Sequence, residues 1–176
     1  VVVTEHGVPS DGTTDATEAI QKVIDENPNR TIFFPDGLYL ISHSINTPAE
    51  PTKSVHLVLG NYAVLKATGD WKDGGAIVRL GAIHKANNIY INGSNYGLSG
   101  GIIDGSNVAD GISIDGGRET RIENVSIKHT QIGIHIKHGA NNGSSDADVC
   151  NVNITGNGKS NSKGLLVEGV DNTLTN

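Results

Sequence analysis

The sequence predicts an all-β fold of the solenoid type, in which short strands stack coil upon coil, with one helix near the N-terminus. Two observations support this prediction. First, 23 glycines and many Asn, Asp, Ser and Thr residues divide the 176 residues into short apolar segments at nearly regular intervals. Second, these segments form two interleaved series, one in which each strand follows an Asn and one in which each follows a Gly. Repeats at periods of roughly 20–50 residues are typical of units that bury their apolar faces by stacking.

The helix is predicted over about residues 15–27, in the segment DATEAIQKVIDEN. Asp15 followed three residues later by Glu18 is typical of a capped N-terminus. The dipeptide Asn27-Pro28 ends the helix, because proline lacks an amide donor and disfavours helical geometry in the residue before it. The apolar residues recur at helical spacing: Ala16, Ala19, Ile20, Val23 and Ile24.

From about residue 31 to the C-terminus the chain is predicted to form coils of strands and turns. The expected strands are TIFF, GLYLIS, VHLVL, YAVLKA, AIVRL, NIYI, GGIID, GISI, NVSI, GIHI, NVNI and GLLV. The Gly series begins after Gly75, Gly111, Gly133 and Gly164. Because side chains alternate along a strand, counting from these glycines predicts two inward columns that form a buried core, with side chains about 4.8 Å apart. The columns are Ile112, Ile134 and Leu165, and Ile114, Ile136 and Val167.

The Asn series begins after Asn88, Asn124 and Asn151. A solenoid must turn its chain sharply between its faces, and Asn tolerates the left-handed backbone that such a turn can require. Stacked Asn amides can also hydrogen-bond from coil to coil. A structural role is therefore expected for these asparagines, rather than a catalytic one.

The outward residues of the Gly series carry the candidate chemistry. The fourth residue after each glycine forms a column of alternating charge: Arg79, Asp115, Lys137 and Glu168. The neighbouring outward column is Ile77, Ser113, His135 and Leu166. Opposite charges on adjacent strands can simply fix the strand register. Alternatively, His135 beside Lys137 on a rigid face could bind an anionic sugar or move a proton.

Composition and charge argue against nucleic-acid and membrane partners and show no targeting segment. The net charge of -6 predicts no broad nucleic-acid surface and no attraction to an anionic membrane. No apolar run approaches the ~20 residues of a membrane-spanning helix, and the N-terminus lacks a signal-peptide profile. The absence of Met suggests a mature or trimmed chain, and a single Cys excludes an intrachain disulfide.

The segment GVPSDGTTDATEAIQKVID, followed by TIFFPDGLYLIS, resembles the start of pectin-lyase-like proteins. The resemblance covers essentially the whole chain. It implies an all-β, single-stranded right-handed parallel β-helix in which a short N-terminal α-helix caps the solenoid. The superfamily includes polygalacturonases, alginate epimerases, exo-glucanases and phage tailspike depolymerases. The resemblance therefore implies an extracellular or cell-surface protein that acts on a polysaccharide, without choosing the reaction.

Residues 107–139 are similar to the stretch of polygalacturonases that carries the catalytic aspartates. On this alignment Asp110 lies where the first catalytic Asp belongs. Gln131 and Ile132 replace the paired aspartates, and neither side chain can donate or accept a proton for glycoside hydrolysis. Lys163 replaces the expected His. Inverting hydrolysis by that machinery is therefore not expected.

Alginate epimerases and related lyases carry an Asp-Pro-His-Glu motif on the same kind of strand. That motif is absent here, and His135 and Lys137 occupy its Asp and His positions. Abstraction of a proton next to a uronate carboxylate needs a base and a positive group. The predicted catalytic residues are therefore His135 and Lys137, with Asp110 or Asp115 as an orienting carboxylate. Predicted substrate-binding residues are Arg79, His138, Glu168 and the loop aromatic Trp71, which could instead cover a core edge.

Residue spacing predicts no cofactor and no metal site. Four aspartates in Gly- and Asn-rich loops offer Ca²⁺ as an alternative, although acidic loops are usually acidic for solubility: Asp70, Asp73, Asp146 and Asp148. The histidines show no metal-ligand spacing. His129 lies close to the candidate coil and is expected to assist it.

The C-terminal segment GVDNTLTN is expected to start another Asn-led unit, whose triplet 173–175 has the opposite apolar phase. Residues 1–176 are thus expected to be one β-helix domain, the N-terminal part of a longer solenoid or one that pairs with another copy. Two functions stay open. The first is a lyase-like, epimerase-like or diverged glycosidase enzyme on an acidic polysaccharide. The second is a non-catalytic β-helix that binds polysaccharide or serves as a structural piece, as in a tailspike.

Overall fold

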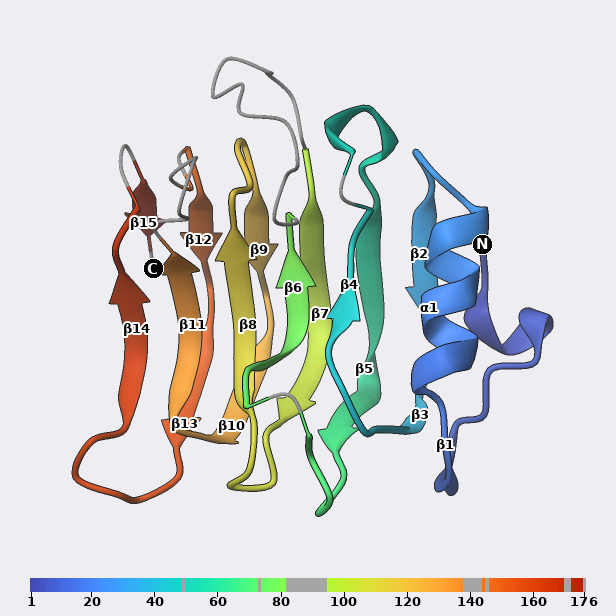
Figure 1. Cartoon of the computed structure of the whole chain (residues 1–176), viewed down its shortest axis with the longest axis horizontal. Coiled ribbons are helices and arrows are strands. Elements are labelled where there is room, and N and C mark those ends of the chain that lie inside the picture. The colour runs from blue at the N-terminus through green and yellow to red at the C-terminus, as the bar shows by residue number, and fades with distance from the viewer. Residues whose placement is uncertain are drawn as a thin grey trace.

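The computed structural model describes residues 1–48, 50–72, 74–81, 95–137, 144, 146–169 and 172–175. Strands dominate this part of the chain and form two sheets, which lie one behind the other in Figure 1. Every strand pairing among the described residues is parallel. Parallel pairing of strands that follow one another in space, coil after coil, is the arrangement that the interleaved series predicts.

The larger sheet follows the order β1-β3-β5-β7-β9-β12-β15, with β2, β10 and β13 attached to it. The bounds of these strands are β1 Asp11–Asp15, β2 Thr31–Phe34, β3 Gly37–Ile41, β5 His56–Ala67, β7 Gly97–Asp104, β9 Arg121–Glu123, β10 Ser126–Thr130, β12 Asp148–Cys150, β13 Asn153–Gly156 and β15 Thr173–Thr175. The long strand β5 pairs with β2 along its first half and with β3 along its second half. In the same way, β9 and β10 pair with the two halves of β7.

The smaller sheet has the order β14-β11-β8-β6-β4. Its strands are β4 Ile45–Asn46, β6 Ala76–Leu80, β8 Asp110–Asp115, β11 Ile132–Lys137 and β14 Lys163–Val167. The chain visits the first half of the larger sheet, then its second half, and then the smaller sheet, before it starts the next circuit. Each circuit therefore places one strand of the Gly series in the smaller sheet.

The helix α1 (Thr17–Glu26) lies at the N-terminal end of the stack (Figure 1) and contacts β4. It begins two residues later than predicted, because Asp15 belongs to β1 and the N-cap residue is Ala16, which forms no side-chain cap. The Asp15 carboxylate still accepts the amide of Thr17, the first helical residue, at 3.0 Å. The Gln21 side chain bonds the backbone of Asn46 in both directions, which docks the helix onto β4. Two short 3-10 helices complete the described elements, η1 (Val3–His6) and η2 (Pro51–Lys53). None of the described helices is long and apolar enough to cross a membrane.

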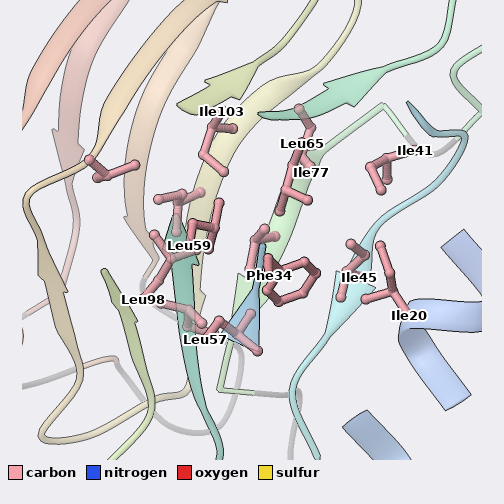
Figure 2. Packing of buried hydrophobic residues seen from close by; sticks show 14 of the residues in the cluster. Ile20, Phe34, Ile41, Ile45, Leu57, Leu59, Leu65, Ile77, Leu98 and Ile103 are labelled. Carbon is pink, nitrogen blue, oxygen red and sulfur yellow. The ribbon is translucent and has the colours of Figure 1, made fainter. Parts of the chain in front are cut away.

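The core lies between the two sheets and is made of branched aliphatic side chains from both (Figure 2). The predicted inward column is confirmed, because Ile134 pairs with Ile112 on one side and with Leu165 on the other. Ile114 and Ile136 follow in the same register and are fully buried. Val167 continues their column but is 40% exposed, because β14 is the outermost strand of the smaller sheet and has no further described strand beside it. At roughly 25 cal/mol per Å² of apolar surface removed from water, such columns supply the main favourable term for this fold.

Asparagines turn the chain between the two halves of the larger sheet, as predicted. Asn124 and Asn151 both have positive φ, 57° and 50°, and each precedes a strand of the second half. The Nδ2 of Asn151 donates to Oδ1 of Asn124 at 3.2 Å, so the amides stack from coil to coil. Asn88 and the predicted strand NIYI lie outside the described residues.

Two register predictions are wrong. Val78 of β6 pairs with Ile112, and Arg79 pairs with Ser113, two residues away from the alignment that counting from Gly75 predicts. Ile77 is fully buried in the core rather than outward (Figure 2). The reason is that Ala76, the residue after Gly75, pairs with Asp110, the residue before Gly111. The two glycines are therefore not opposite each other, and counting from them gives the wrong register.

The expected Asn-led unit at the C-terminus is also misplaced. β15 pairs with β12, which puts Thr173–Thr175 in the column of β9 and β12 rather than in that of β10 and β13. Leu174 therefore stands opposite Val149, and its apolar phase is the correct one for that column. Asn172 therefore precedes a strand of the first half of the larger sheet. Its Oδ1 accepts the Ala147 amide of the preceding coil at 3.1 Å.

Candidate functional site

The outer side of the smaller sheet gathers charged side chains from four neighbouring coils. Strand alternation sends Ile112 and Ile114 into the core, and the residues between and beyond them away from it. We call this surface the charged face and define it by five residues: Arg79 of β6, Asp115 of β8, His135 and Lys137 of β11, and Glu168 directly after β14. Parallel strands stacked about 4.8 Å apart hold these side chains at fixed spacing.

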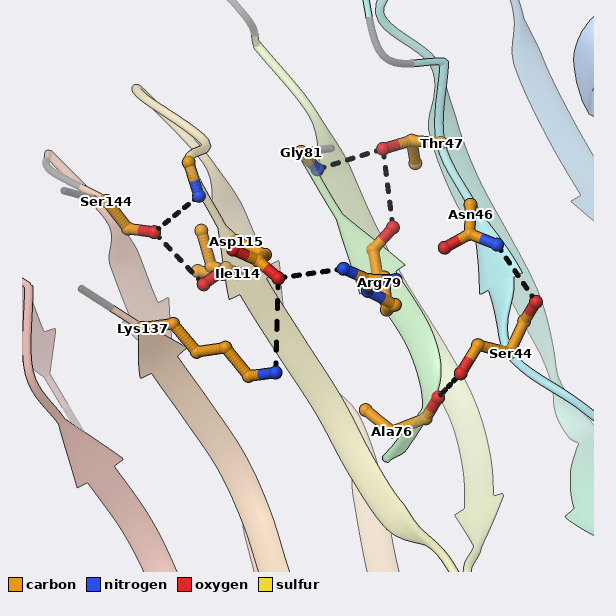
Figure 3. A network of polar contacts seen from close by, with 11 residues as sticks. Ser44, Asn46, Thr47, Ala76, Arg79, Gly81, Ile114, Asp115, Lys137 and Ser144 are labelled. Carbon is orange, nitrogen blue, oxygen red and sulfur yellow. Dashed lines mark hydrogen bonds and ion pairs between the residues drawn. The ribbon is translucent and has the colours of Figure 1, made fainter. Parts of the chain in front are cut away.

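Asp115 lies between two cations on the charged face (Figure 3). Its Oδ2 accepts from Nη2 of Arg79 at 2.8 Å and lies 3.9 Å from Nζ of Lys137. Its side chain is 10% exposed, whereas those of Arg79 and Lys137 are 27% and 35% exposed. The carboxylate is thus held below two more accessible positive groups, which are the ones that a bound anion would meet first.

His135 forms the second pair of the charged face. Its Nε2 lies 2.6 Å from Oε2 of Glu168, and its ring is mostly buried while the Glu168 side chain is half exposed. The strand register places His135 opposite Ser113 and Leu166. Among the described residues, the buried Oγ of Ser113 has no hydrogen-bond partner. The imidazole is therefore held in place by a carboxylate from the next coil, as a third group orients the base in many catalytic sites.

Asp110 lies at the edge of the smaller sheet where β8 begins. Its Oδ1 accepts the amide of Ile132 on the neighbouring strand at 2.9 Å. Burial raises the pKa of this carboxyl above its ordinary value, and this effect outweighs the Ile132 hydrogen bond and the positive charges of His135 and Lys137, which lower it. A carboxyl that keeps its proton to higher pH is suited to donate it.

Hydroxyl groups pin the ends of these strands to their neighbours (Figure 3). Ser144 accepts the Gly116 amide at 3.0 Å and donates to the Ile114 carbonyl at 3.0 Å. Thr47 accepts the Gly81 amide at 2.9 Å, just beyond Arg79. The charged face is thus built on a rigid sheet rather than on loops, which is a favourable support for a binding or catalytic site.

The two other predicted substrate-binding residues are not part of the charged face. Trp71 lies in the loop between β5 and β6 and packs against the hydrophobic core. This packing agrees with the core-edge role that the sequence left open. The contact of Trp71 with a sugar stays a prediction. His138 lies outside the described residues. The expected Ca²⁺ alternative also stays a prediction: across the described ranges, no three His, Cys, Asp or Glu side chains are grouped to hold a metal ion.

The structure adds a pair that the sequence did not predict. Nδ1 of His129 lies 2.8 Å from Oδ1 of Asp104, which is 6% exposed. Although burial raises the pKa of Asp104, the hydrogen bonds from the Ser106 amide and from His129 together hold it below its usual range. In the sequence, the only sign of this pair is that Asp104 ends the apolar strand segment GGIIDG. Its partner comes from the next coil, where Lys128 stands opposite Asp104, so the pair depends on strand register and not on nearby residues.

Comparisons with known proteins agree on the type of fold. A family model described as rhamnogalacturonase A/epimerase, pectate lyase-like, matches residues 1–175. A candidate glycosyl hydrolase from Parabacteroides merdae superposes with a TM-score of 0.72 at 18% identity, over 100% of this chain and 93% of that one. None of the proteins of curated function matches the sequence.

Two further solved structures share the fold over part of their length. The A-module of the mannuronan C-5 epimerase AlgE4 from Azotobacter vinelandii has a TM-score of 0.63 at 19% identity, over 99% of this chain and 49% of that one. ORF18 of Geobacillus virus E2 has a TM-score of 0.62 at 17% identity, over 98% of this chain and 40% of that one. The chain therefore spans about half or less of the length of these two proteins. The similarity shows a shared fold and nothing more.

Proposed function

We propose, on the premise that this chain belongs to the rhamnogalacturonase A/epimerase, pectate lyase-like family, that it acts on an acidic polysaccharide at the charged face. Membership makes the fold a carbohydrate-active one. The finer assignment is abstraction of the proton next to a uronate carboxylate, the step that C5 epimerisation and β-elimination share. This chemistry needs a base together with positive charge at the carboxylate, and it does not need the paired aspartates that Gln131 and Ile132 replace.

One observation carries the proposal: His135 lies on the same rigid face as the cations Arg79 and Lys137, which are joined to each other through Asp115. In this mechanism Arg79 and Lys137 bind the substrate carboxylate and stabilise the enolate that forms from it. When Nε2 of His135 shares its proton with Glu168, the lone pair on Nδ1 accepts the C5 proton. The electron pair of the broken C–H bond moves into the enolate.

Asp110 completes the sequence of proton transfers. In the epimerase branch a proton returns to C5 from the opposite side, and no other bond breaks. In the lyase branch the C4–O bond breaks as the enolate collapses, and the leaving oxygen takes a proton. Asp110 is the proposed acid, because burial keeps its carboxyl protonated to higher pH than an ordinary aspartate.

The test measures abstraction of the C5 proton, the first step that epimerisation and β-elimination share. Polyuronates, including polymannuronate and polygalacturonate, are incubated with the protein in D₂O, and NMR follows deuterium at C5 while ultraviolet absorbance follows unsaturated product. The protein is expected to incorporate deuterium, and His135→Gln to lose at least about 100-fold of the rate, the usual contribution of a general base. The matched control is Lys22→Ala, an exposed substitution on α1. Deuterium incorporation by His135→Gln at the original rate would overturn the assignment of the base.

A second function is favoured by one specific observation, namely that the charges of this face pair with one another. Arg79 and Lys137 flank Asp115, and His135 pairs with Glu168, as expected for a ladder that fixes strand register. A non-catalytic polysaccharide-binding or structural β-helix would show this pattern. It predicts polysaccharide binding without deuterium exchange, unsaturated product or new reducing ends. New reducing ends without deuterium exchange would instead indicate a diverged glycosidase.

The same proposal covers the architecture and setting of the protein. The alternation of each circuit between the sheets supports a right-handed parallel β-helix in which residues 1–176 form one domain. The family supports an extracellular or cell-surface location and a polysaccharide as partner.

A further inference from the structure

A cavity of about 280 Å³ lies on the larger sheet, where β5, β7 and β9 begin, and the charged face belongs to the other sheet. The cavity is one corner of the chain away from the charged face, since β8 ends at Asp115 and residues 116–120 lead to Arg121 at the start of β9. The lining residues are His56, Asn95, Tyr96, Gly97, Glu119 and Arg121.

The cavity exists because a glycine stands between two basic side chains. His56, Gly97 and Arg121 lie opposite one another on three adjacent strands. Strands about 4.8 Å apart separate the backbones of His56 and Arg121 by roughly 10 Å. A Cβ on Gly97 would lie 2.5 Å from Cδ2 and 2.6 Å from Nε2 of His56. The imidazole therefore leans over Gly97, in the direction of Arg121, and any larger residue at position 97 would displace it.

The polar groups around the cavity are only partly used within the protein. Nε2 of His56 is buried and, in the part of the chain that the structure describes, has no hydrogen-bond partner. A buried polar atom left without a partner is unfavourable, and His56 lines the cavity, so a small rotation of its imidazole would let a ligand in the cavity supply the missing partner. Arg121 is 59% exposed and forms an ion pair with Asp148, in which Nε and Oδ2 are 3.7 Å apart and therefore make no hydrogen bond. The Tyr96 hydroxyl, by contrast, donates to the Pro48 carbonyl at 2.7 Å.

We propose that this cavity binds one uronate unit, a sugar ring that carries a carboxylate. The Arg121 guanidinium matches the planar carboxylate with parallel donors, and His56 donates to it or to a ring hydroxyl from Nε2. Glu119 and Asn95 accept from the remaining hydroxyls, which a simple anion site would not require. The volume is at the lower end of the roughly 300–1,000 Å³ of small-molecule sites, which suits one sugar ring rather than a long oligosaccharide.

This site would hold a substrate unit or a chain end around the corner from the charged face. The choice of a uronate as ligand rests on the proposed function, whereas the existence of a site rests on His56, Gly97 and Arg121 alone. Because the cavity and the charged face lie on different sheets, substitutions separate the two proposals.

Calorimetric and NMR titrations with galacturonate and glucuronate monosaccharides test the proposal, with galactose and acetate as reference ligands. Arg121→Ala and His56→Ala are each expected to weaken uronate binding at least roughly tenfold, the loss expected for one charged hydrogen bond. Gly97→Ala should weaken it as well, by displacing the imidazole. Lys22→Ala, far along the chain on α1, should bind as the unsubstituted protein does, and thermal unfolding confirms that each variant is folded.

The same titrations in His135→Gln keep this proposal separate from the proposed function. Binding that survives His135→Gln and is lost in Arg121→Ala supports a site at the cavity, whatever happens to turnover. Unchanged uronate affinity in both Arg121→Ala and His56→Ala would overturn the proposal. Galactose or acetate binding as tightly as the uronates would overturn the assignment of a uronate as ligand.

Discussion

At the scale of single residues, the chemistry of the charged face depends on how each carboxylate is partnered. Asp115 is nearly buried and neutralises two cations, whereas Glu168 is half exposed and contacts only His135 among its described ion pairs. Exposed pairs contribute about 0–1 kcal/mol, and removing one partner of a buried pair costs more because the remaining charge loses its compensation. The two carboxylates therefore differ in what they do for stability.

Asp115→Asn is expected to lower the free energy of unfolding by about 1–3 kcal/mol, since Arg79 and Lys137 lose their shared partner. Lys137→Gln is the matched control on the same ion pair, with an expected loss below about 1 kcal/mol because its Nζ is 3.9 Å away and partly exposed. Urea denaturation followed by circular dichroism measures both. Equal losses in the two variants would contradict the central position of Asp115.

The pKa values of the half-buried Asp110 and the buried Asp104 are expected to lie on opposite sides of that of an ordinary aspartate, which ¹³C NMR of the side-chain carboxyls measures. Burial raises the pKa of Asp110. The folded state then binds this proton more tightly than the unfolded state, so stability falls as pH rises from the unfolded pKa through the folded one. The pKa of Asp104 is lowered, so its contribution is present above the unfolded pKa and is lost as pH falls through the folded pKa.

Amide variants provide the control for these pH dependences. In the unsubstituted protein, Asp110 lowers the free energy of unfolding as pH rises from 3.8 to its raised pKa, and Asp110→Asn should remove this loss. Asp104 increases the free energy of unfolding as pH rises from its lowered pKa to 3.8, and Asp104→Asn should remove this gain. If both carboxyls titrate together at the ordinary value, burial at these positions does not have the effect described.

At the scale of elements, the corners between strands are set by backbone conformation as much as by side-chain bonding. Asn124 has φ of 57°, a left-handed conformation that costs most residues about 1–2 kcal/mol and costs glycine little. Its amide also accepts from Asn151 in the next coil. Conformation and amide stacking both favour Asn here, and substitution distinguishes them.

Asn124→Ala is expected to lower the free energy of unfolding by about 1–2 kcal/mol. Asn124→Gly should cost clearly less, because glycine adopts positive φ without strain even though the amide is gone. Thermal and urea unfolding of the two variants compare them directly. If glycine costs as much as alanine, the amide stack rather than the backbone conformation makes the main contribution at this corner.

At the scale of the whole molecule, stacked apolar columns hold the described part of the fold together, and we expect no metal to be needed for its stability. Three of the four aspartates that suggested Ca²⁺ have partners within the protein: Asp70 accepts from Thr68, Asp146 accepts from Arg118, and Asp148 forms an ion pair with Arg121. The fourth, Asp73, lies outside the described residues. Chelation with EDTA is therefore expected to leave the thermal midpoint and the first-step deuterium exchange unchanged. A fall of several degrees on chelation, restored by Ca²⁺, would show that a metal site contributes to stability.

Local pattern was sufficient for much of the architecture. The helical spacing around Ile20 and Val23, the period-two alternation around Ile112 and Ile134, and the asparagines at the corners each depend on neighbours along the chain, and the structure confirms all three. The register of β6 and the placement of β15 were wrong, because they depend on how long each loop is and which strand it reaches. A glycine or asparagine before a strand marks a turn without saying which turn it is.

The sequence by itself determined the strand-rich, parallel-stacked class of this protein, its helix and the residue types of its candidate site, because these follow from periodicity and composition. Only the tertiary structure decided that Asp115 is shared by Arg79 and Lys137, that Asp104 faces His129, and that His56 leans over Gly97 in the direction of Arg121. These contacts join residues 22 to 41 positions apart, on different coils. Their geometry is set by strand register, which arises from packing of the whole stack rather than from any local segment.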